Sequence, residues 1–293
     1  MTVPPAWRVR DRVLPLDRPL VMGIVNVTPD SFSDGGQFLE VDAAVRHAIA
    51  LVDEGADIID LGGESTRPHG AREISLEEER YRILPVVREL VRRMPGVIIS
   101  VDTVKSVVAE AALGAGAMIV NDVSAFRLDP RLADVVAASG AGAILMHSRG
   151  TVSDMATYTH AEYAGDVVEV VLLELATQVR MARAAGIASD AIALDPGIGF
   201  AKRSGDSLRL LAGLAAFEVF GAPLVIGASR KRVIGRVTGV SDPRARVHGS
   251  VGAAVAAYER GASIFRVHDV AATRQALDVA AAIRGAARSS VPA

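Results

Sequence analysis

The chain has 293 residues, enough for one large barrel or for two medium-sized domains. Its 32 lysine and arginine residues nearly balance its 34 aspartate and glutamate residues, so a net charge of -2 excludes a global attraction to nucleic acid or to an acidic membrane surface. The absence of cysteine excludes disulfides, thiolate nucleophiles and zinc-thiolate sites, and leaves oxygen or imidazole ligands for any metal.

The first 19 residues contain prolines and charged side chains but no apolar h-region of the kind found in signal peptides. We therefore expect a cytoplasmic protein. The most apolar later window, Leu208 to Ala228, is interrupted by Arg209, Glu218 and Pro223, which excludes a membrane span.

Eight short apolar runs, each ending near a polar residue, predict buried strands. They cover residues 21–25, 57–61, 97–101, 118–120, 143–146, 191–194, 223–228 and 263–267. Helical patterns follow them at 42–54, 75–94, 103–115, 162–185, 207–217 and 250–260, with one more that begins at 130 and a last one that ends at 284. Capping signals mark three helix starts: Asp42, Ser75 with Glu78, and Asp129 before Pro130.

Apolar runs that are continuous rather than alternating, each followed by a helix, predict a parallel sheet covered by helices. Eight such units predict an α/β fold, a single-domain (β/α)8 TIM barrel. A doubly wound open sheet is the alternative. We expect the barrel to span residues 20–287, with an N-terminal extension at 1–19 and a C-terminal tail at 288–293.

In a closed barrel the carboxyl ends of all eight strands meet at one rim, so polar residues at these ends should surround one pocket. These residues are Asn26, Asp60, Asp102, Asn121, His147, Asp195, Lys231 and His268.

Three of the rim residues, Asp102, Asn121 and Asp195, form a neutral-to-acidic set. A carboxylate accepts two N–H bonds side by side and an asparagine both donates and accepts, so this set suits the edge of a flat heterocycle. A plainer interpretation is that Asp102 caps a helix beginning at Thr103 and that Asp195 only precedes a turn proline.

A basic set lies in or beside the later loops and indicates an anionic substrate, with phosphate the usual anion at the seventh and eighth loops of this fold. Its members are Arg67, Lys202, Arg230, Lys231, Arg266 and His268. Solvated surface charge is the alternative, favoured for Arg232 and Arg236. Asn26 and the hydroxyl groups after it offer oxygen ligands for a Mg²⁺ that keeps several waters and is held mostly by substrate phosphates.

Eight ordered motifs between about Leu20 and Arg284 resemble those of dihydropteroate synthases, the folate-pathway targets of sulfonamides. They are NVTPDSFSDGG (26–36), GGESTRP (62–68), SVDT (100–103), NDVS (121–124), MHSRG (146–150), DPGIGFAK (195–202), GASRK (227–231) and RVHDV (266–270). Within the sixth motif, Ala201 stands where the family commonly has glycine.

The resemblance implies a (β/α)8 barrel, usually a homodimer, that acts as a transferase forming a C–N bond. The reaction joins 6-hydroxymethyl-7,8-dihydropterin diphosphate to p-aminobenzoate, gives 7,8-dihydropteroate and pyrophosphate, and is assisted by Mg²⁺. Sulfonamides compete with p-aminobenzoate, and neither nucleic acid nor a membrane takes part.

Carried over residue by residue, the resemblance also implies roles for this chain. The pterin would be held by Asp102, Asn121, Asp195 and Lys231, of which Asp102, Asp195 and Lys231 would be catalytic. The diphosphate would be bound by Asn26, Arg266 and His268, with Asn26 as the metal ligand. The p-aminobenzoate side would be formed by Phe32, Thr66, Arg67, Pro68, Phe200 and Ser229.

Two other functions share the pterin pocket. A methyltransferase domain would pass a methyl group to a corrinoid partner, but it would not need the GGESTRP and SRK motifs. A catalytically silent pterin-binding paralogue would act through a partner and release no pyrophosphate.

Overall fold

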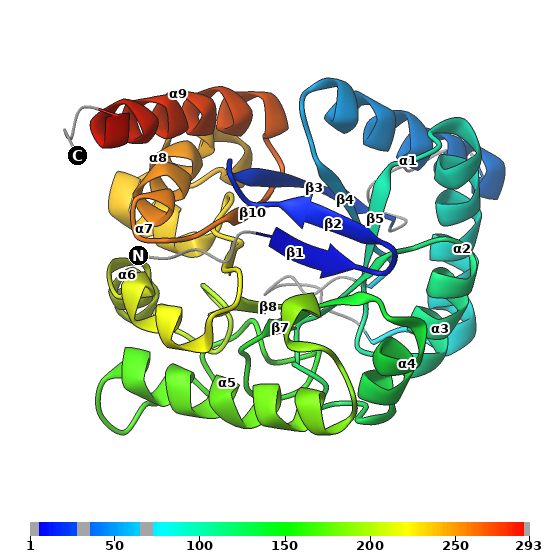
Figure 1. Cartoon of the computed structure of the whole chain (residues 1–293), viewed down its shortest axis with the longest axis horizontal. Coiled ribbons are helices and arrows are strands. Elements are labelled where there is room, and N and C mark those ends of the chain that lie inside the picture. The colour runs from blue at the N-terminus through cyan, green and yellow to red at the C-terminus, as the bar shows by residue number, and fades with distance from the viewer. Residues whose placement is uncertain (1–5, 28–35, 65–72, 290–293) are drawn as a thin grey trace.

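The structure is a computed structural model of the chain, and it describes residues 6–27, 36–64 and 73–289. Parallel strands curve into a barrel that is surrounded by helices (Figure 1). The barrel strands are β3 (Leu20–Asn26), β4 (Ile58–Gly62), β5 (Ile98–Asp102), β6 (Ile119–Asp122), β7 (Gly142–Met146), β8 (Ile192–Asp195), β9 (Val225–Ile226) and β10 (Ile264–Val267). The α-helices are α1 (Gly36–Asp53), α2 (Leu76–Arg93), α3 (Ser106–Gly114), α4 (Arg131–Ser139), α5 (Val167–Ala184), α6 (Ser204–Ala212), α7 (Arg232–Thr238), α8 (Val247–Tyr258) and α9 (Val270–Ser289).

The sheet closes on itself. Its strands follow the order β8-β7-β6-β5-β4-β3-β10-β9, and every neighbouring pair is parallel. A parallel bridge between Leu194 of β8 and Leu224, the residue before β9, joins the two ends of this order. The predicted (β/α)8 barrel is therefore confirmed, and the open sheet is wrong.

The start of α1 differs from the sequence prediction. The helix begins at Gly36, so Asp42 lies inside it and does not cap it. The Asp42 carboxylate instead forms ion pairs with Arg46, one turn further along the helix, and with Arg93 at the end of α2. An acidic residue near a loop was therefore mistaken for a cap.

Later helices differ as well, and α7 was not predicted. The predicted helix from residue 162 begins at Val167, where Asp166 caps it by accepting a hydrogen bond from the Val168 amide at 2.8 Å. Another predicted helix is divided between α6 and the 3-10 helix η3 (Leu214–Phe220).

The predicted Ser75 cap is present, whereas the N-cap position of α4 is Pro130, one residue after the predicted Asp129. The Ser75 hydroxyl accepts a hydrogen bond from the Glu78 amide at 3.1 Å and begins α2. One oxygen of Asp129 accepts from the Arg131 amide at 3.2 Å, and the other accepts from the Ser106 amide at 2.9 Å. Asp129 therefore serves α3 as well as α4.

A hairpin that the sequence analysis did not predict covers the amino end of the barrel. Its strands β1 (Ala6–Val9) and β2 (Arg12–Pro15) are antiparallel and lie across the front of the barrel in Figure 1. Trp7 of β1 is fully buried between the hairpin and the barrel, and its indole N–H donates to the Ala191 carbonyl at 3.0 Å. The apolar cluster around it consists of Trp7, Val9, Leu16, Leu20, Met22, Ile58, Ile98, Ile119, Ile144, Ala193, Val225 and Ile264.

The side chains inside the barrel change from apolar to polar along its axis. Residues two apart in a strand point to the same side, so the interior position after Ile58 is Asp60 and the positions after Ile98 are Ser100 and Asp102. The polar interior layer consists of Asp60, Ser100, Asp102, Asn121, Asp195 and Arg266. Within the described ranges, no helix has the length and apolar character that crossing a bilayer would require.

Candidate active site

The strand register sets the predicted residues of the first four barrel strands side by side. Asn26 pairs with Gly62, Gly62 pairs with Asp102, and Asp102 pairs with Asn121. On the other side of the barrel, Asp195 pairs with Met146 at the end of β7. Since all these strands are parallel, the side chains emerge at one rim, as predicted.

Arg266 of β10 reaches across the barrel to the acids of two strands. Its Nε donates to Asp60 Oδ2 at 2.6 Å and its Nη2 donates to Asp102 Oδ2 at 2.7 Å. The same oxygen of Asp60 accepts from Asn121 Nδ2 at 3.3 Å. The acidic and basic sets are thus joined in one network instead of lying on separate sides of the pocket.

Asp195 and Lys231 meet Arg266 around a glycine. A Cβ atom added at Gly227 would lie 3.7 Å from Asp195 Oδ2, 3.8 Å from Lys231 Nζ and 3.9 Å from Arg266 Cβ. The missing side chain leaves room among three charged groups that come from three different strand ends. This space, bounded by acids and bases, is the centre of the candidate site.

The loop after β8 fixes Asp195 and Lys231. Asp195 Oδ1 accepts a hydrogen bond from the Gly197 amide at 2.7 Å, and Lys231 Nζ donates to the Ile198 carbonyl at 2.5 Å. The same ammonium group lies 4.4 Å from the centre of the Phe200 ring. One short loop therefore holds both charged groups of this side of the site.

Burial shifts the titration of these groups. It raises the pKa of Asp195 and of Asp102, and for Asp102 the charge of Arg266 opposes the shift while that of Asp60 adds to it. Burial lowers the pKa of Lys231 to about 8, against the attraction of Asp195. Burial also opposes the Arg266 charge, but the neighbouring carboxylates raise its pKa above the ordinary value. Shifted acids and bases that share one pocket are typical of an active site.

Known proteins resemble this chain in both sequence and fold. A family profile described as pterin binding enzyme matches residues 22–268. The dihydropteroate synthase of Synechocystis sp. is 44% identical over 266 residues, which cover 91% of this chain and 90% of that protein. The structure of Xanthomonas albilineans dihydropteroate synthase with 4-aminobenzoic acid has a TM-score of 0.88 at 46% identity and covers 98% of this chain and 99% of that chain. The Xanthomonas albilineans structure in complex with 7,8-dihydropteroate has a TM-score of 0.86 at 43% identity and covers 98% and 100%.

The chain belongs to the dihydropteroate synthase family. It is accordingly a transferase of folate biosynthesis, which condenses 6-hydroxymethyl-7,8-dihydropterin diphosphate with p-aminobenzoate to 7,8-dihydropteroate and pyrophosphate. The resemblance that the eight motifs carry is thereby confirmed for the family and its reaction. The roles of individual residues are a separate question, which the geometry addresses.

Two of the residues assigned to the p-aminobenzoate side, Phe200 and Ser229, lie among the described residues. Phe200 lies against Lys231. The Ser229 hydroxyl contacts His268 Nδ1 at 3.1 Å and accepts from the His268 amide at 3.2 Å. The other members of that set, Phe32, Thr66, Arg67 and Pro68, lie outside the described residues.

The plainer interpretation of the acids fails for Asp102. The helix after it begins at Ser106 with Lys105 at the N-cap position, and the Ser106 amide donates to Asp129. For Asp195 the interpretation holds in part, because Oδ1 closes the turn to Gly197 while Oδ2 faces the space at Gly227. The Asp195 side chain therefore both stabilises the local turn and borders the candidate site.

Lys202 differs from the expectation that it faces an anionic substrate. It is 1% exposed, and its ammonium group contacts His147 Nδ1 at 2.8 Å and donates to the Phe200 carbonyl at 3.0 Å. On the other side of the ring, His147 Nε2 lies 2.8 Å from Glu174 Oε2. Burial lowers the pKa of Lys202 to about 7 and that of His147 to about 4. Lys202 therefore ties together the loops behind the site.

Arg230 is also committed to the fold. Its Nε donates to one oxygen of Asp269 at 2.9 Å, and its Nη2 donates to the other at 2.5 Å. A bidentate pair of this kind fixes the start of α9 rather than leaving a cation for substrate. Neither the expected substrate contact nor the alternative of solvated surface charge describes Arg230, which is a partly buried ion-pair partner of Asp269.

The sequence analysis gave no role in the site to two residues, Asp60 and Gly227. Asp60 was placed at the rim, but nothing in the sequence showed that it pairs with Arg266. The signal that was available is its position two residues after Ile58, which turns it into the barrel.

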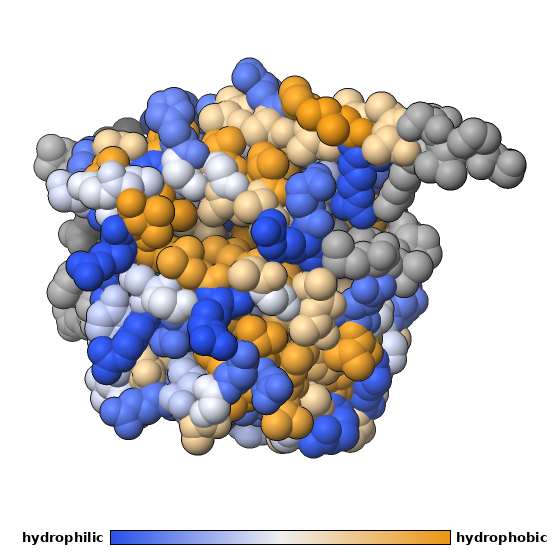
Figure 2. Space-filling model, turned by 90° about the vertical axis from the view of Figure 1, so that its left-hand side faces the viewer, coloured by the Kyte–Doolittle hydropathy of each residue, from blue (hydrophilic) through white to orange (hydrophobic). Residues whose placement is uncertain are grey.

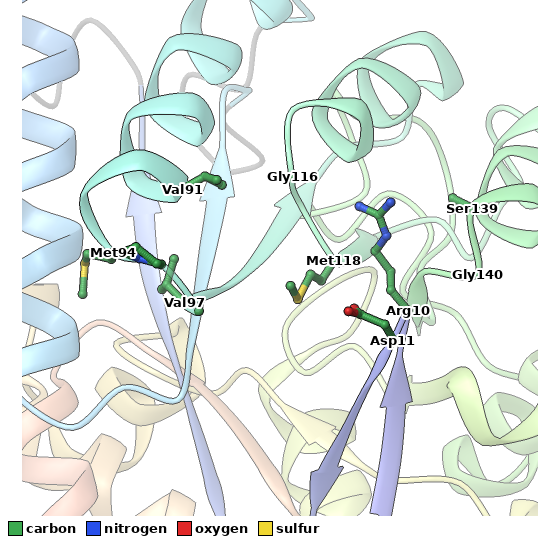
Figure 3. A pocket seen from close by; sticks show the side chains of 11 residues that line it. Arg10, Asp11, Val91, Met94, Val97, Gly116, Met118, Ser139 and Gly140 are labelled. Carbon is green, nitrogen blue, oxygen red and sulfur yellow. The ribbon is translucent and has the colours of Figure 1, made fainter.

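A different hollow, of about 790 Å³, lies at the amino end of the strands (Figure 3). Met94 and Met118 line it beside the hairpin turn, and Arg10 reaches from that turn to donate to the carbonyls of Leu113 and Ala117 at 3.0 Å each. It is at the opposite end of the barrel from the strand ends that carry the family motifs, so it is separate from the candidate active site.

Proposed function

We propose that Asp102, Asn121, Asp195 and Lys231 hold the pterin in this chain. What supports the proposal is that Asp195 and Lys231 meet beside Gly227, while Asp102 and Asn121 are paired in register and linked to the same site through Arg266 and Asp60. The carboxylates can accept adjacent N–H groups of a heterocycle. Lys231, whose pKa is lowered by burial, would supply a donor for a ring oxygen. Asp102, Asp195 and Lys231 would be the catalytic residues.

The diphosphate would lie toward Asn26, Arg266 and His268. Asn26 ends β3, and Asp102 ends β5, the second strand along the sheet from β3. Arg266 carries the guanidinium group that suits a phosphate. The described residues contain no cluster of three His, Asp or Glu side chains that could hold a metal by themselves. This fits a Mg²⁺ held by Asn26, water and the diphosphate itself, where it would offset the negative charge of the leaving group.

The reaction needs no enzyme nucleophile. The bond between the pterin methylene carbon and the diphosphate oxygen breaks, and its electrons leave with pyrophosphate toward Arg266 and His268. The carboxylate of Asp195 would stabilise the positive charge that develops on the pterin and its methylene. The amine of p-aminobenzoate then donates its electron pair to that carbon and loses a proton to solvent. Phe200 and Ser229, with Phe32, Thr66, Arg67 and Pro68, would form the p-aminobenzoate side.

We also propose a cytoplasmic homodimer. The support is the orange surface that Figure 2 shows on the side of the molecule formed by the helices on the left of Figure 1, together with a set of exposed apolar side chains carried by α6, η3, α7 and α9. This set consists of Leu208, Val219, Val237, Val279 and Ile283. Contiguous exposed apolar surface marks protein interfaces. Sedimentation velocity should give one species of twice the chain mass, and a monomer at micromolar concentration would contradict the dimer.

The test of the residue assignments is pyrophosphate release with both substrates and Mg²⁺, repeated with a sulfonamide as competitor. Asp195→Ala should abolish turnover and leave the circular dichroism spectrum intact, because the one hydrogen bond that the structure shows for this carboxylate is with the Gly197 amide in the turn after β8. Near-normal turnover in that variant would refute the assignment. No pyrophosphate release by the unaltered chain would point to a silent paralogue.

A further inference from the structure

We propose that Asp60 is a positioning residue of the active site, which acts on the pterin diphosphate through Arg266 and Asn121. The inference rests on the proposed function of those two residues. Asp60 belongs to neither the heterocycle set nor the diphosphate set, although it lies in the same polar interior layer, two residues before the Gly62 that pairs with Asp102.

A single oxygen of Asp60 holds one member of each set. Oδ2 accepts from Arg266 Nε at 2.6 Å and from Asn121 Nδ2 at 3.3 Å. The side chain is 0% exposed, so neither water nor a surface cation competes for this oxygen. The residue that would bind the diphosphate and a residue that would bind the ring are therefore aligned by the same buried charge.

The second carboxylate on Arg266 makes the alignment specific. Asp60 of β4 accepts a hydrogen bond from Arg266 Nε, and Asp102 of β5 accepts one from Arg266 Nη2. These two bonds to different strands fix the plane of the guanidinium group. With Asp102 alone, the group could turn about a single contact. Because Asp102 must also accept bonds from the pterin, Asp60 is the partner of Arg266 that no substrate group would claim.

Asp60 also sets the electrostatic balance of the interior layer. Asp102 is surrounded by Arg266 from β10, Asp60 from β4, Glu79 from α2 and Asp122 from β6, and Lys231 lies within its field. Of these charges, Asp60 opposes the ionisation of Asp102 while it supports the cation of Arg266. Removing its charge should therefore lower the pKa of Asp102, an effect that a purely structural residue would not have.

The neighbouring strand offers a matched control. Ser100 pairs in register with Asp60, is equally buried, and its hydroxyl oxygen has no hydrogen-bond partner among the described residues. Ser100→Ala changes the same layer of the barrel without touching Arg266 or Asn121. It should leave activity and its pH dependence unchanged.

The experiment compares Asp60→Asn with the unaltered chain in steady-state pyrophosphate release. The unaltered chain must first release pyrophosphate, and its failure would count against the proposed function, not against the role of Asp60. In an active protein, D60N should lower kcat/KM for the pterin diphosphate by about 10- to 100-fold, the scale of a displacement of about 1 Å in a catalytic group. KM for p-aminobenzoate should stay near its original value, and the acidic limb of the pH profile should move to lower pH.

Asp60→Glu separates charge from position and keeps the test open if D60N does not fold, since loss of one member of a buried pair is strongly destabilising. D60E retains the charge but extends the carboxylate by one carbon, about 1.5 Å. It should lower kcat/KM for the pterin diphosphate without moving the pH profile. Normal kcat/KM in D60E or in folded D60N would overturn the proposal, as would an equal loss in S100A.

Discussion

Gly227→Ala should leave the protein folded and weaken the binding of the pterin. Gly227 is outside the positive-φ region, and the nearest atoms to an added Cβ are 3.7 to 3.9 Å away, which is ordinary van der Waals contact. Alanine at a position with a compatible backbone stabilises by about 0.4–1 kcal/mol, because it restricts the unfolded chain. The melting temperature should therefore stay the same or rise.

The magnitude of the binding defect follows from where the methyl group would lie. It would stand among Asp195, Lys231 and Arg266, in the space that the proposed function gives to the pterin. Overfilling a packed site by one methyl group costs about 1–3 kcal/mol. Such a cost corresponds to about a 5- to 150-fold rise in the dissociation constant.

Isothermal titration with the pterin diphosphate measures this effect, and thermal unfolding reports on the fold. Gly252→Ala is the control, since its added Cβ meets nothing within 4 Å and it lies inside α8. G252A should gain about 0.5–1 kcal/mol of stability, as alanine does in a helix interior, and bind the pterin normally. Unchanged affinity in G227A would show that the pterin lies elsewhere, and a large loss of stability would show that the space is not open.

Two further predictions concern stability. Trp7→Ala removes the largest buried side chain under the hairpin and its bond to the Ala191 carbonyl, so it should lower the free energy of unfolding by about 3–5 kcal/mol; its kcat should be unaltered below the melting transition, and a loss of kcat in folded protein would contradict the separation of the two barrel ends. Burial, with Lys202 adding to it, lowers the pKa of His147 from 6.5 to about 4, so between these values the unfolded chain binds a proton that the folded chain does not. Stability should therefore fall as the pH drops below 6.5, by about 2 kcal/mol near pH 5 from this residue. Urea unfolding of the original chain and of His147→Gln should show a shallower pH dependence in the variant, and equal slopes would rule out this role.

The barrel itself could be predicted because parallel strands buried on both faces are continuous apolar runs that end at polar residues. This pattern located Asn26, Asp102, Asn121 and Asp195 at one rim. It depends only on the backbone, since the register of parallel strands brings their carboxyl ends together.

Side-chain partners could not be predicted in the same way. Arg266 and Asp60 are 206 residues apart, and their contact depends on which way a long side chain turns inside the barrel. Lys202 was expected to face an anionic substrate because the sequence does not show that the His147 ring and a backbone carbonyl enclose it. The hairpin was missed because β2 is mostly exposed and does not carry the buried pattern of a strand.

One departure from the family pattern has a local explanation. Ala201 has φ 47°, in the left-handed region where glycine is favoured, which accounts for the glycine that the family commonly has there. Its amide donates to the Met155 carbonyl at 2.6 Å, and its carbonyl accepts from the Tyr163 hydroxyl at 3.0 Å. These bonds hold the strained residue in place.

The apolar cluster around Trp7 closes the amino end of the barrel. Among the described residues, apolar side chains fill the barrel below the polar layer, so reactants and products have to pass through the end of the barrel where the strands finish. Under the proposed assignments the pterin binds deepest in the barrel, and p-aminobenzoate binds nearer to the rim. The pterin must then arrive first, and an early p-aminobenzoate would block the way in.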